Sequence, residues 1–261
     1  FELKKPKEEI NLNLLRIKLK NNIIKSKRVV LINFISKIKR LFNQPGFTIA
    51  FLGVDGSGKS TVIEYIKPTL NNAFHKAVYY EHMRPNKLPS IAYLFGKKEN
   101  FKNPVTKPHE GKASGFVGSL FRWLYYLLDY TIGFYLKIWP KITTRSCVWI
   151  FDRYYYDFLI DPLRSRIKIH KWIIKLGQLI IPEPDLILCL GANANSIHKR
   201  KQELTLNEIE RQVFELKIFC ETHQKAVWID TGKDIATSSE FALDVIIKMM
   251  SKRFEKVNIN K

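Results

Sequence analysis

Residues 53–61 read Gly-Val-Asp-Gly-Ser-Gly-Lys-Ser-Thr, which completes the pattern G-x-x-x-x-G-K-[ST] of a phosphate-binding loop. In such a loop the glycines free backbone N–H groups to wrap phosphate oxygens, and the lysine reaches the β- and γ-phosphates. The apolar run 47–52 precedes the loop as a predicted strand, and a helical pattern begins at 61–66. The amino end of that helix then faces the phosphates, where its dipole favours negative charge. This order of strand, loop and helix predicts a nucleotide-binding α/β domain.

The loop supplies most of the candidate ligands for a nucleotide and its metal ion. The positions expected to contact the nucleotide are Gly53, Asp55, Gly56, Ser57, Gly58, Lys59, Ser60 and Thr61. Lys59 is also a candidate catalytic residue, and the Ser60 hydroxyl is a candidate ligand of Mg²⁺. By itself, such a loop is equally compatible with a GTPase, a motor or a transporter ATPase.

The composition predicts one packed domain with a basic appendage. The chain has 261 residues, of which 46% are hydrophobic, and a formal net charge of +20. Residues 1–46 hold 12 Lys and Arg against 3 Glu, so nearly half of the excess charge sits in this segment. A positive field concentrates phosphorylated ligands. No zinc finger or RNA-binding motif accompanies the charge, so we expect no specific nucleic-acid partner.

We expect a helical extension over 1–46 and a folded domain over 47–261. Apolar residues recur at helical spacing between 29 and 42, and lysines and arginines fall largely outside that stripe. A basic amphipathic helix over 27–42 can lie on an anionic membrane surface, or pack its stripe on the domain or a partner. Three widely spaced cysteines form no disulfide or zinc pattern, which favours a cytoplasmic location with at most peripheral membrane contact.

Further apolar runs alternate with helix-length segments. They cover 77–81, 146–151, 185–190 and 226–229. This alternation predicts a parallel sheet with helices on both faces. The most apolar segment, 116–139, is interrupted by Arg122, Asp129 and Lys137 at intervals close to two helical turns. We expect a core helix of the domain whose charged side faces a site, rather than a membrane span.

A second half of the site follows the run 146–151, where the chain reads Asp152-Arg153-Tyr154. In an open parallel sheet, ligands collect beyond the carboxyl ends of the strands, so we expect Asp152 beside the phosphate loop. Its carboxylate can hold Mg²⁺ through water or accept a proton from the attacking group. Arg153 can grip an anionic acceptor with its planar guanidinium. Asp152 and Arg153 are therefore candidate catalytic residues, and Asp152 is a candidate metal ligand.

In these motifs the chain resembles the thymidylate kinase family of P-loop kinases. The likeness rests on the loop 53–61, on Asp152-Arg-Tyr154, and on the run 184–190 with His198-Lys-Arg-Lys201 after it. The resemblance implies a P-loop NTPase three-layer sandwich with a five-stranded parallel sheet, and ATP and Mg²⁺ as cofactors. It also implies transfer of the γ-phosphoryl group to a phosphate or hydroxyl of a small acceptor, by default a nucleoside monophosphate such as dTMP. We also expect that the chain can form a homodimer.

Family members without an arginine inside the loop usually supply one from a mobile lid. Here Ser57 stands before the last glycine of the loop, so the resemblance assigns the catalytic cation to Arg200, Lys201 or Arg211. Phosphoryl transfer depends mainly on positioning and charge neutralisation, which suits a basic lid. We take Arg200 as the catalytic candidate and Arg211 as a nucleotide contact. Thr231 lies where the family's turn beside the adenine is expected.

The acceptor side departs from the family's pattern. The second strand is followed by Glu81-His-Met-Arg-Pro85, which keeps only the Arg-Pro element of the family's turn, and the residues after Tyr154 differ as well. The candidate acceptor contacts are Arg84, Arg122, Asp129, Arg153, Tyr154 and Asp157. The carboxylates of Asp129, Asp157 and Asp161 bind hydroxyl groups well and repel phosphates, which points to a sugar or another polyol.

Three functions therefore stay open. The first is a nucleoside monophosphate kinase, and the second is a kinase of the same fold that acts on a saccharide or surface-polymer precursor. The third is a regulatory protein that binds a nucleotide without turnover. The presence of Asp152, Arg153 and the basic stretch 198–201 favours the two kinases.

Overall fold

The computed structural model describes residues 35, 36, 38, 40, 44–89 and 115–259. The chain divides into two units, Phe1–Asn43 and Gln44–Lys261. In the first unit Ile35, Ser36, Ile38 and Arg40 are helical. The rest of the predicted basic helix over 27–42 lies outside the described residues, so its membrane contact and the expected extension over 1–46 stay predictions.

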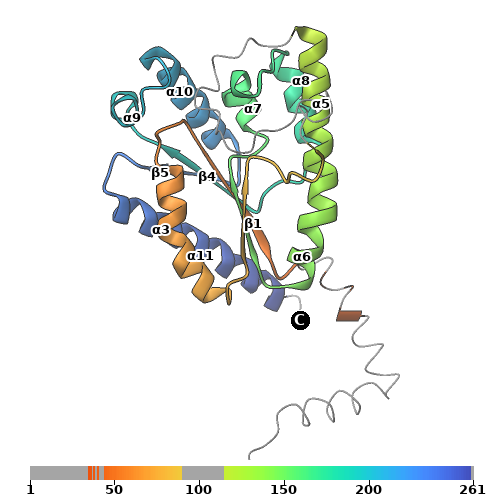
Figure 1. The fold of residues 1–261 in the computed structure, drawn as a ribbon. Coiled ribbons are helices and arrows are strands. Elements are labelled where there is room, and N and C mark those ends of the chain that lie inside the picture. The colour runs from red at the N-terminus through yellow and green to blue at the C-terminus, as the bar shows by residue number, and fades with distance from the viewer. Residues whose placement is uncertain (1–34, 37, 39, 41–43, 90–114, 260–261) are drawn as a thin grey trace, which may run out of the picture. The chain divides into compact units, whose positions relative to one another are not determined.

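Five parallel strands form the sheet at the centre of the second unit (Figure 1). In order across the sheet they are β2 (Val78–His82), β3 (Val148–Asp152), β1 (Phe47–Gly53), β4 (Leu186–Gly191) and β5 (Ala226–Asp230). The pairing aligns Phe51 with Asp152 and Gly53 with Leu190, so the loop after β1 lies between the carboxyl ends of β3 and β4. The predicted five-stranded parallel sheet is confirmed.

Helices cover both faces of this sheet (Figure 1). One face carries α3 (Lys59–Ala73) and α11 (Ile235–Ile259). The other carries α5 (Phe116–Gly133), α6 (Trp139–Thr144), α7 (Asp157–Ile160), α8 (Lys171–Gln178) and α10 (Leu206–Thr222). A π-helical turn at Phe134–Ile138 joins α5 to α6, a 3₁₀ turn at Pro162–Ser165 follows α7, and α9 (Ala194–Arg200) follows β4. The predicted three-layer α/β arrangement is confirmed.

The central strand β1 is buried along its whole length, which gives the loop a rigid base. Phe47, Ile49 and Phe51 belong to the core under α3 and α11, whereas Ala50 and Leu52 belong to the opposite core. A strand covered on both faces reads as a continuous apolar run rather than an alternating one. This explains why the run before the loop could be identified as a strand.

The charged side of α5 and the turn after it faces the end of β2. Asp129 is fully buried and accepts a hydrogen bond from Arg84 Nη1 at 2.9 Å. Lys137 forms an ion pair with Glu81 at 2.5 Å. The opposite side of α5 is apolar and exposed, which differs from the core helix expected there. No helix in the described parts of the chain is long and apolar enough to cross a membrane.

Candidate functional site

The loop after β1 forms a tight cradle that depends on its glycines. Gly56 and Gly58 have φ angles of +85° and +86°, a left-handed conformation that residues with a Cβ rarely adopt. At Gly53, a Cβ would lie 2.5 Å from both the Leu190 carbonyl oxygen and Ser57 Oγ. Gly58 is also the N-cap of α3, so the first N–H groups of this helix open onto the loop. The backbone therefore has the geometry that binds an anion.

Lys59 is folded back into this cradle. Its Nζ donates hydrogen bonds to the carbonyl oxygens of Gly53 at 2.7 Å and Val54 at 3.0 Å, and the side chain is buried. Burial, and then the positive charge of Arg153, lower the pKa of Lys59 to about 7. Phosphate oxygens bound in the loop would add negative charge beside Nζ and so favour its protonated form.

Asp55 in the loop binds two arginines from distant parts of the chain. Arg153 Nη2 donates to Asp55 Oδ1 at 2.5 Å, and Arg164 Nη1 donates to Asp55 Oδ2. Burial by itself would raise the pKa of Asp55, but the charges of Arg153, Lys59 and Arg164 outweigh it and hold this pKa far below its usual range. Asp55 is therefore ionised, and it holds both guanidinium groups at the mouth of the loop.

Arg153 is buried and held from several directions. Its backbone N–H donates to the Phe51 carbonyl at 2.9 Å, and its φ angle of +75° is rare for a residue with a side chain. The guanidinium donates to Asp157 as well as to Asp55. Burial would lower the pKa of Arg153, but the charges of Asp157 and Asp55 raise it above its usual value, so the side chain stays charged.

Asp152 presents one unpaired carboxylate oxygen to the site. Its Oδ2 accepts a hydrogen bond from the Tyr80 hydroxyl at 2.9 Å, whereas the buried Oδ1 has no hydrogen-bond partner among the described residues. Leaving such an oxygen unpaired is costly, which marks it as a position for a cation or a water. The exposed Ser60 lines the same cavity. One carboxylate and one hydroxyl fit Mg²⁺, which completes its shell with waters and substrate phosphates.

Two adjoining cavities lie over the loop. The larger, of about 410 Å³, is lined by Asp55, Gly56, Gly58, Lys59, Ser60, Thr61, His82, Asp152, Arg153, Arg164, Arg200 and Lys201. The smaller, of about 190 Å³, is lined by Gly58, Thr61, Val62, Arg200, Thr231, Lys233, Ile235 and Ser238. Gly58, Thr61 and Arg200 border both cavities. Cationic side chains outnumber carboxylates around the larger one, which suits a polyanionic ligand.

The structure brings Arg200 and Thr231 to these cavities. Arg200 Nη2 donates to the Thr231 carbonyl at 2.9 Å, so α9 is tied to the turn after β5. Thr231 Oγ1 is buried and has no hydrogen-bond partner among the described residues. Lys201, the alternative lid cation, also lines the larger cavity.

Arg211 is not brought to the site. Its guanidinium donates to the Ile160 carbonyl at 3.0 Å and pairs with Glu208 at 2.6 Å, and it borders neither cavity. The Thr205 hydroxyl caps α10 by accepting from the Glu208 backbone N–H, six residues before Arg211. Arg211 therefore ties the start of α10 to α7, which corrects its expected position beside the nucleotide.

Several residues that were predicted to contact the acceptor instead form hydrogen bonds with other residues of the protein. Asp129 accepts hydrogen bonds from Arg84 and from the backbone N–H groups of Lys87 and Leu88 at 2.9 and 2.7 Å. These bonds use both of its oxygens, so Asp129 holds Arg84 and the chain after β2 in place. Asp157 is likewise engaged by Arg153. Neither carboxylate borders the cavities over the loop, and neither does Arg84.

Tyr154 and Arg122 also lie away from the cavities. The Tyr154 ring is fully buried and packs against Phe151 and Tyr130, and its hydroxyl donates to the Pro182 carbonyl at 2.5 Å. It serves the core, which corrects its expected acceptor contact. Arg122 lies on α5 with a buried Nε that has no hydrogen-bond partner in the described part of the chain. Of the predicted acceptor residues, Arg153 alone borders the larger cavity.

Sequence reasoning missed Arg164 and His82, which both border the larger cavity. His82 is the last residue of β2 and is paired in register with Asp152, so its strand-end position could have identified it. Its pKa is lowered, chiefly by burial, with Arg153 and Arg164 adding to the effect against Asp152. Arg164 lies within the 3₁₀ turn, which no sequence motif predicts, and the fold alone brings it to Asp55.

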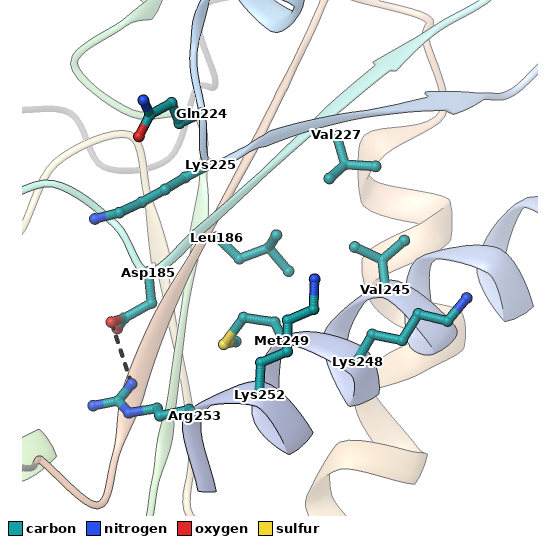
Figure 2. Close-up of a pocket in the computed structure, with 10 residues that line it drawn as sticks. All are labelled: Asp185, Leu186, Gln224, Lys225, Val227, Val245, Lys248, Met249, Lys252 and Arg253. Atoms are coloured by element: carbon teal, nitrogen blue, oxygen red, sulfur yellow. Dashed lines mark ion pairs between the residues drawn. The ribbon is translucent and has the colours of Figure 1, made fainter. Parts of the chain in front are cut away.

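A further cavity, of about 740 Å³, lies near the amino ends of β4 and β5, against α11 (Figure 2). Three of its four lining cations have partners close by: Lys225 pairs with Glu183, Lys248 with Asp244, and Arg253 with Asp185. The loop lies at the opposite, carboxyl edge of the sheet. None of the predicted site residues borders this cavity, so we place the candidate site at the loop.

Comparison with known proteins supports the fold. No protein-family model and no curated protein sequence matches the chain. Among solved structures, the thymidylate kinase of Ehrlichia chaffeensis matches with a TM-score of 0.51 at 17% identity, over 77% of this chain and 98% of that one. The thymidylate kinase of Candida albicans matches with a TM-score of 0.56 at 18% identity, over 80% and 93%. The chain therefore has a thymidylate kinase-like fold.

Proposed function

We propose that this protein is an ATP-dependent kinase that transfers the γ-phosphoryl group to a small phosphorylated acceptor, with a nucleoside monophosphate such as dTMP as the default. The observation that carries the proposal is the larger cavity over the loop. Lys59, Arg153, Arg164 and Arg200 line this cavity together with Asp152, whose Oδ1 has no hydrogen-bond partner among the described residues. A phosphoryl group in transfer carries charge on several oxygens, and these cations are placed to offset it.

The donor side follows from the loop and the smaller cavity. The N–H groups at the start of α3 and Lys59 would bind the β- and γ-phosphates, and the cavity beside Thr231 would take the rest of the nucleotide. Ser60 and Asp152 would hold Mg²⁺, which when bound neutralises phosphate charge. Arg200 borders both cavities and would reach the γ-phosphate from the side of α9.

The acceptor side favours a phosphate over a neutral sugar. Arg153 and Arg164 share one carboxylate, Asp55, and they can extend to an acceptor phosphate through their remaining N–H groups. The carboxylates that suggested a polyol are already engaged, since Asp157 binds Arg153 and Asp161 accepts from the Arg164 backbone N–H. A hydroxyl-binding pocket built from them therefore has little support.

The proposed phosphoryl transfer depends more on the positioning of the reacting phosphate groups than on proton transfer. Lys59 and Arg200 would bind oxygens of the transferred group, while Arg153 and Arg164 would orient an acceptor phosphate oxygen toward it. Because an acceptor phosphate is already ionised near neutral pH, no strong base is needed to activate it. Asp152 would serve mainly to place positive charge through its free Oδ1.

An acceptor screen tests the proposal. The full chain would be given ATP, Mg²⁺ and, in parallel, nucleoside monophosphates, sugar phosphates and free sugars, and ADP formation would be measured. We expect phosphorylated acceptors to raise ADP formation at least 100-fold over ATP alone, and Lys59→Ala to abolish the increase. Turnover with free sugars alone would favour the saccharide kinase, and ATP binding without acceptor-dependent turnover would favour a regulatory protein.

A further inference from the structure

Tyr80 on β2 contacts the Asp152 carboxylate without bordering the candidate site. Its hydroxyl donates to Asp152 Oδ2 at 2.9 Å, and Tyr80 lines neither of the two cavities over the loop. Asp152 lines the larger cavity, and its buried Oδ1 has no hydrogen-bond partner among the described residues. The carboxylate is therefore held through one oxygen, while the other stays available to a ligand.

The parallel register of β2 and β3 sets this contact. Tyr80 is aligned with Ile150, two residues before Asp152, so its side chain reaches diagonally along the neighbouring strand. Alternate residues of a strand point to the same face of a sheet, and Val78 and Ile150 belong to the core under α3. Tyr80 and Asp152 therefore lie on this same face, and the sheet itself fixes the distance between them.

The Tyr80 ring has a contact of its own, which does not involve the hydroxyl. Lys67 Nζ on α3 lies 5.8 Å from the centre of the ring, within the range of a cation–π contact. Tyr80 is 42% exposed, so water can take the place of a missing hydroxyl and no buried cavity forms. Replacement by phenylalanine therefore removes the hydrogen bond to Asp152 and leaves the ring and its packing in place.

A neutral donor suits a carboxylate that binds a cation. The terminal torsion of an aspartate side chain is broad, so an unrestrained carboxylate turns its oxygens in many directions. A lysine or arginine at the position of Tyr80 would restrain this rotation, but its charge would repel a metal ion. The Tyr80 hydroxyl restrains Asp152 and leaves the negative charge of the carboxylate uncancelled. Groups that hydrogen-bond to metal-binding carboxylates commonly set the orientation of those ligands in this way.

We propose that Tyr80 is a positioning residue for the metal site of the proposed kinase. Its hydroxyl fixes the Asp152 carboxylate so that Oδ1 stays directed to the cavity, where it can bind Mg²⁺ or a water of the ion. Tyr80 acts through Asp152 and contacts neither the nucleotide nor the acceptor. This inference rests on the proposed function, because it takes Asp152 as a metal ligand beside a nucleotide, but it holds for any acceptor.

Mn²⁺ binding, followed by electron paramagnetic resonance, tests this role without turnover. The full chain, in excess over the non-hydrolysable ATP analogue AMPPNP, would be titrated with Mn²⁺ in place of Mg²⁺. For Tyr80→Phe we expect the dissociation constant of Mn²⁺ to rise roughly 10-fold or more, as is usual when a group that orients a metal ligand is lost. The matched control is Tyr79→Phe, which removes a hydroxyl from the adjacent residue of β2, whose ring stacks on Trp149 on the opposite face. It should bind Mn²⁺ as the wild type does.

The outcomes separate this inference from the proposed function. Equal Mn²⁺ affinities for the wild type and Tyr80→Phe would overturn the role of Tyr80 alone. A wild type that binds no Mn²⁺ with AMPPNP would overturn that role together with the proposed metal site. Failure of every phosphorylated acceptor in a turnover assay would reject the proposed acceptor and leave the result for Tyr80 standing.

A double-mutant cycle separates positioning from a general loss of structure. In an Asp152→Asn background the carboxylate that Tyr80 orients is absent, so adding Tyr80→Phe should change the Mn²⁺ affinity by less than about twofold. With EDTA present, AMPPNP should bind the wild type and Tyr80→Phe equally, because the loop and Lys59 bind phosphates without the metal. Additive effects of the two substitutions, or a parallel loss of metal-free AMPPNP binding, would show that Tyr80 supports the structure of the site and does not act through Asp152.

Discussion

Lys59 combines a buried position with a pKa of about 7, and this makes stability depend on pH. Unfolding returns the pKa of the lysine to its ordinary value of 10.5, so between pH 7 and 10.5 the unfolded chain binds more protons than the folded one. The contribution of this residue to the free energy of unfolding therefore rises with pH across that window. Below pH 7 both states are protonated and its pH dependence disappears.

Urea unfolding of wild type and Lys59→Met at pH 7 and pH 9.5 measures how the contribution of Lys59 to the free energy of unfolding depends on pH. We expect the free energy of unfolding of the wild type, relative to the variant, to increase on the order of 3 kcal/mol between the two pH values. Parallel pH profiles for the two proteins would show that Lys59 keeps an ordinary pKa in the folded chain.

The sequence did not identify Arg164 as a site residue, but the structure places it beside Asp55 and at the larger cavity. If it binds the acceptor phosphate, Arg164→Gln should raise the KM for the acceptor roughly 10- to 100-fold, as loss of a charge-assisted hydrogen bond implies. The KM for ATP should change much less. Steady-state kinetics with Arg166→Gln, an exposed neighbour, provides the control. A rise confined to the KM for ATP would move Arg164 to the donor side.

At this scale, the sequence could predict residues that belong to local motifs. Lys59, Asp152 and Arg153 line one cavity because each belongs to a loop or a strand end that the sequence identifies, and their catalytic roles stay predictions. Arg211 and Tyr154 were misplaced, because the direction in which a side chain leaves its element depends on packing that no motif records. Arg164 was missed for the same reason, since it reaches Asp55 across 109 residues of chain.

Among the elements, α5 and the chain after β2 depend on a single carboxylate. Asp129 is fully buried and accepts hydrogen bonds from Arg84, Lys87 and Leu88. In Asp129→Asn the amide group would face the Arg84 guanidinium without charge compensation, so we expect a loss of about 3 kcal/mol in the free energy of unfolding. Urea unfolding measures it. Asp244→Asn, which breaks an exposed ion pair with Lys248, should cost less than about 1 kcal/mol.

Equal losses from the two substitutions would mean that Asp129 is no more important to stability than a surface charge.

The sequence predicted that Asp129 lies on a charged side of α5, but not that its partners would be Arg84 and two backbone N–H groups. Those partners lie more than 40 residues earlier in the chain and meet α5 only because β2 pairs with β3. The sequence predicted that α5 is a core helix, whereas several of its apolar residues are exposed. An apolar residue that packs on the domain and one that stays exposed look alike in sequence.

For the whole molecule, the parallel order of the strands converts separate sequence motifs into one site. The carboxyl ends of β1 and β3 are adjacent, which brings the loop 53–61 and Asp152-Arg153 to the same edge. This part of the site follows from the sequence, because parallel strands always direct their carboxyl ends to one edge of the sheet. The proposed acceptor side does not follow, because Arg164 reaches the larger cavity from the 3₁₀ turn, whose placement depends on packing.

The central claim is that the cavity over the loop transfers a phosphoryl group from ATP to a phosphorylated acceptor. Phosphorus-31 NMR of the full chain with ATP, Mg²⁺ and dTMP follows every phosphorus atom in the mixture at once. We predict that the γ-phosphate signal of ATP decays while the signals of ADP and of a new nucleoside diphosphate appear in equal amounts. Unchanged spectra, or release of inorganic phosphate without any new acceptor signal, would contradict the account.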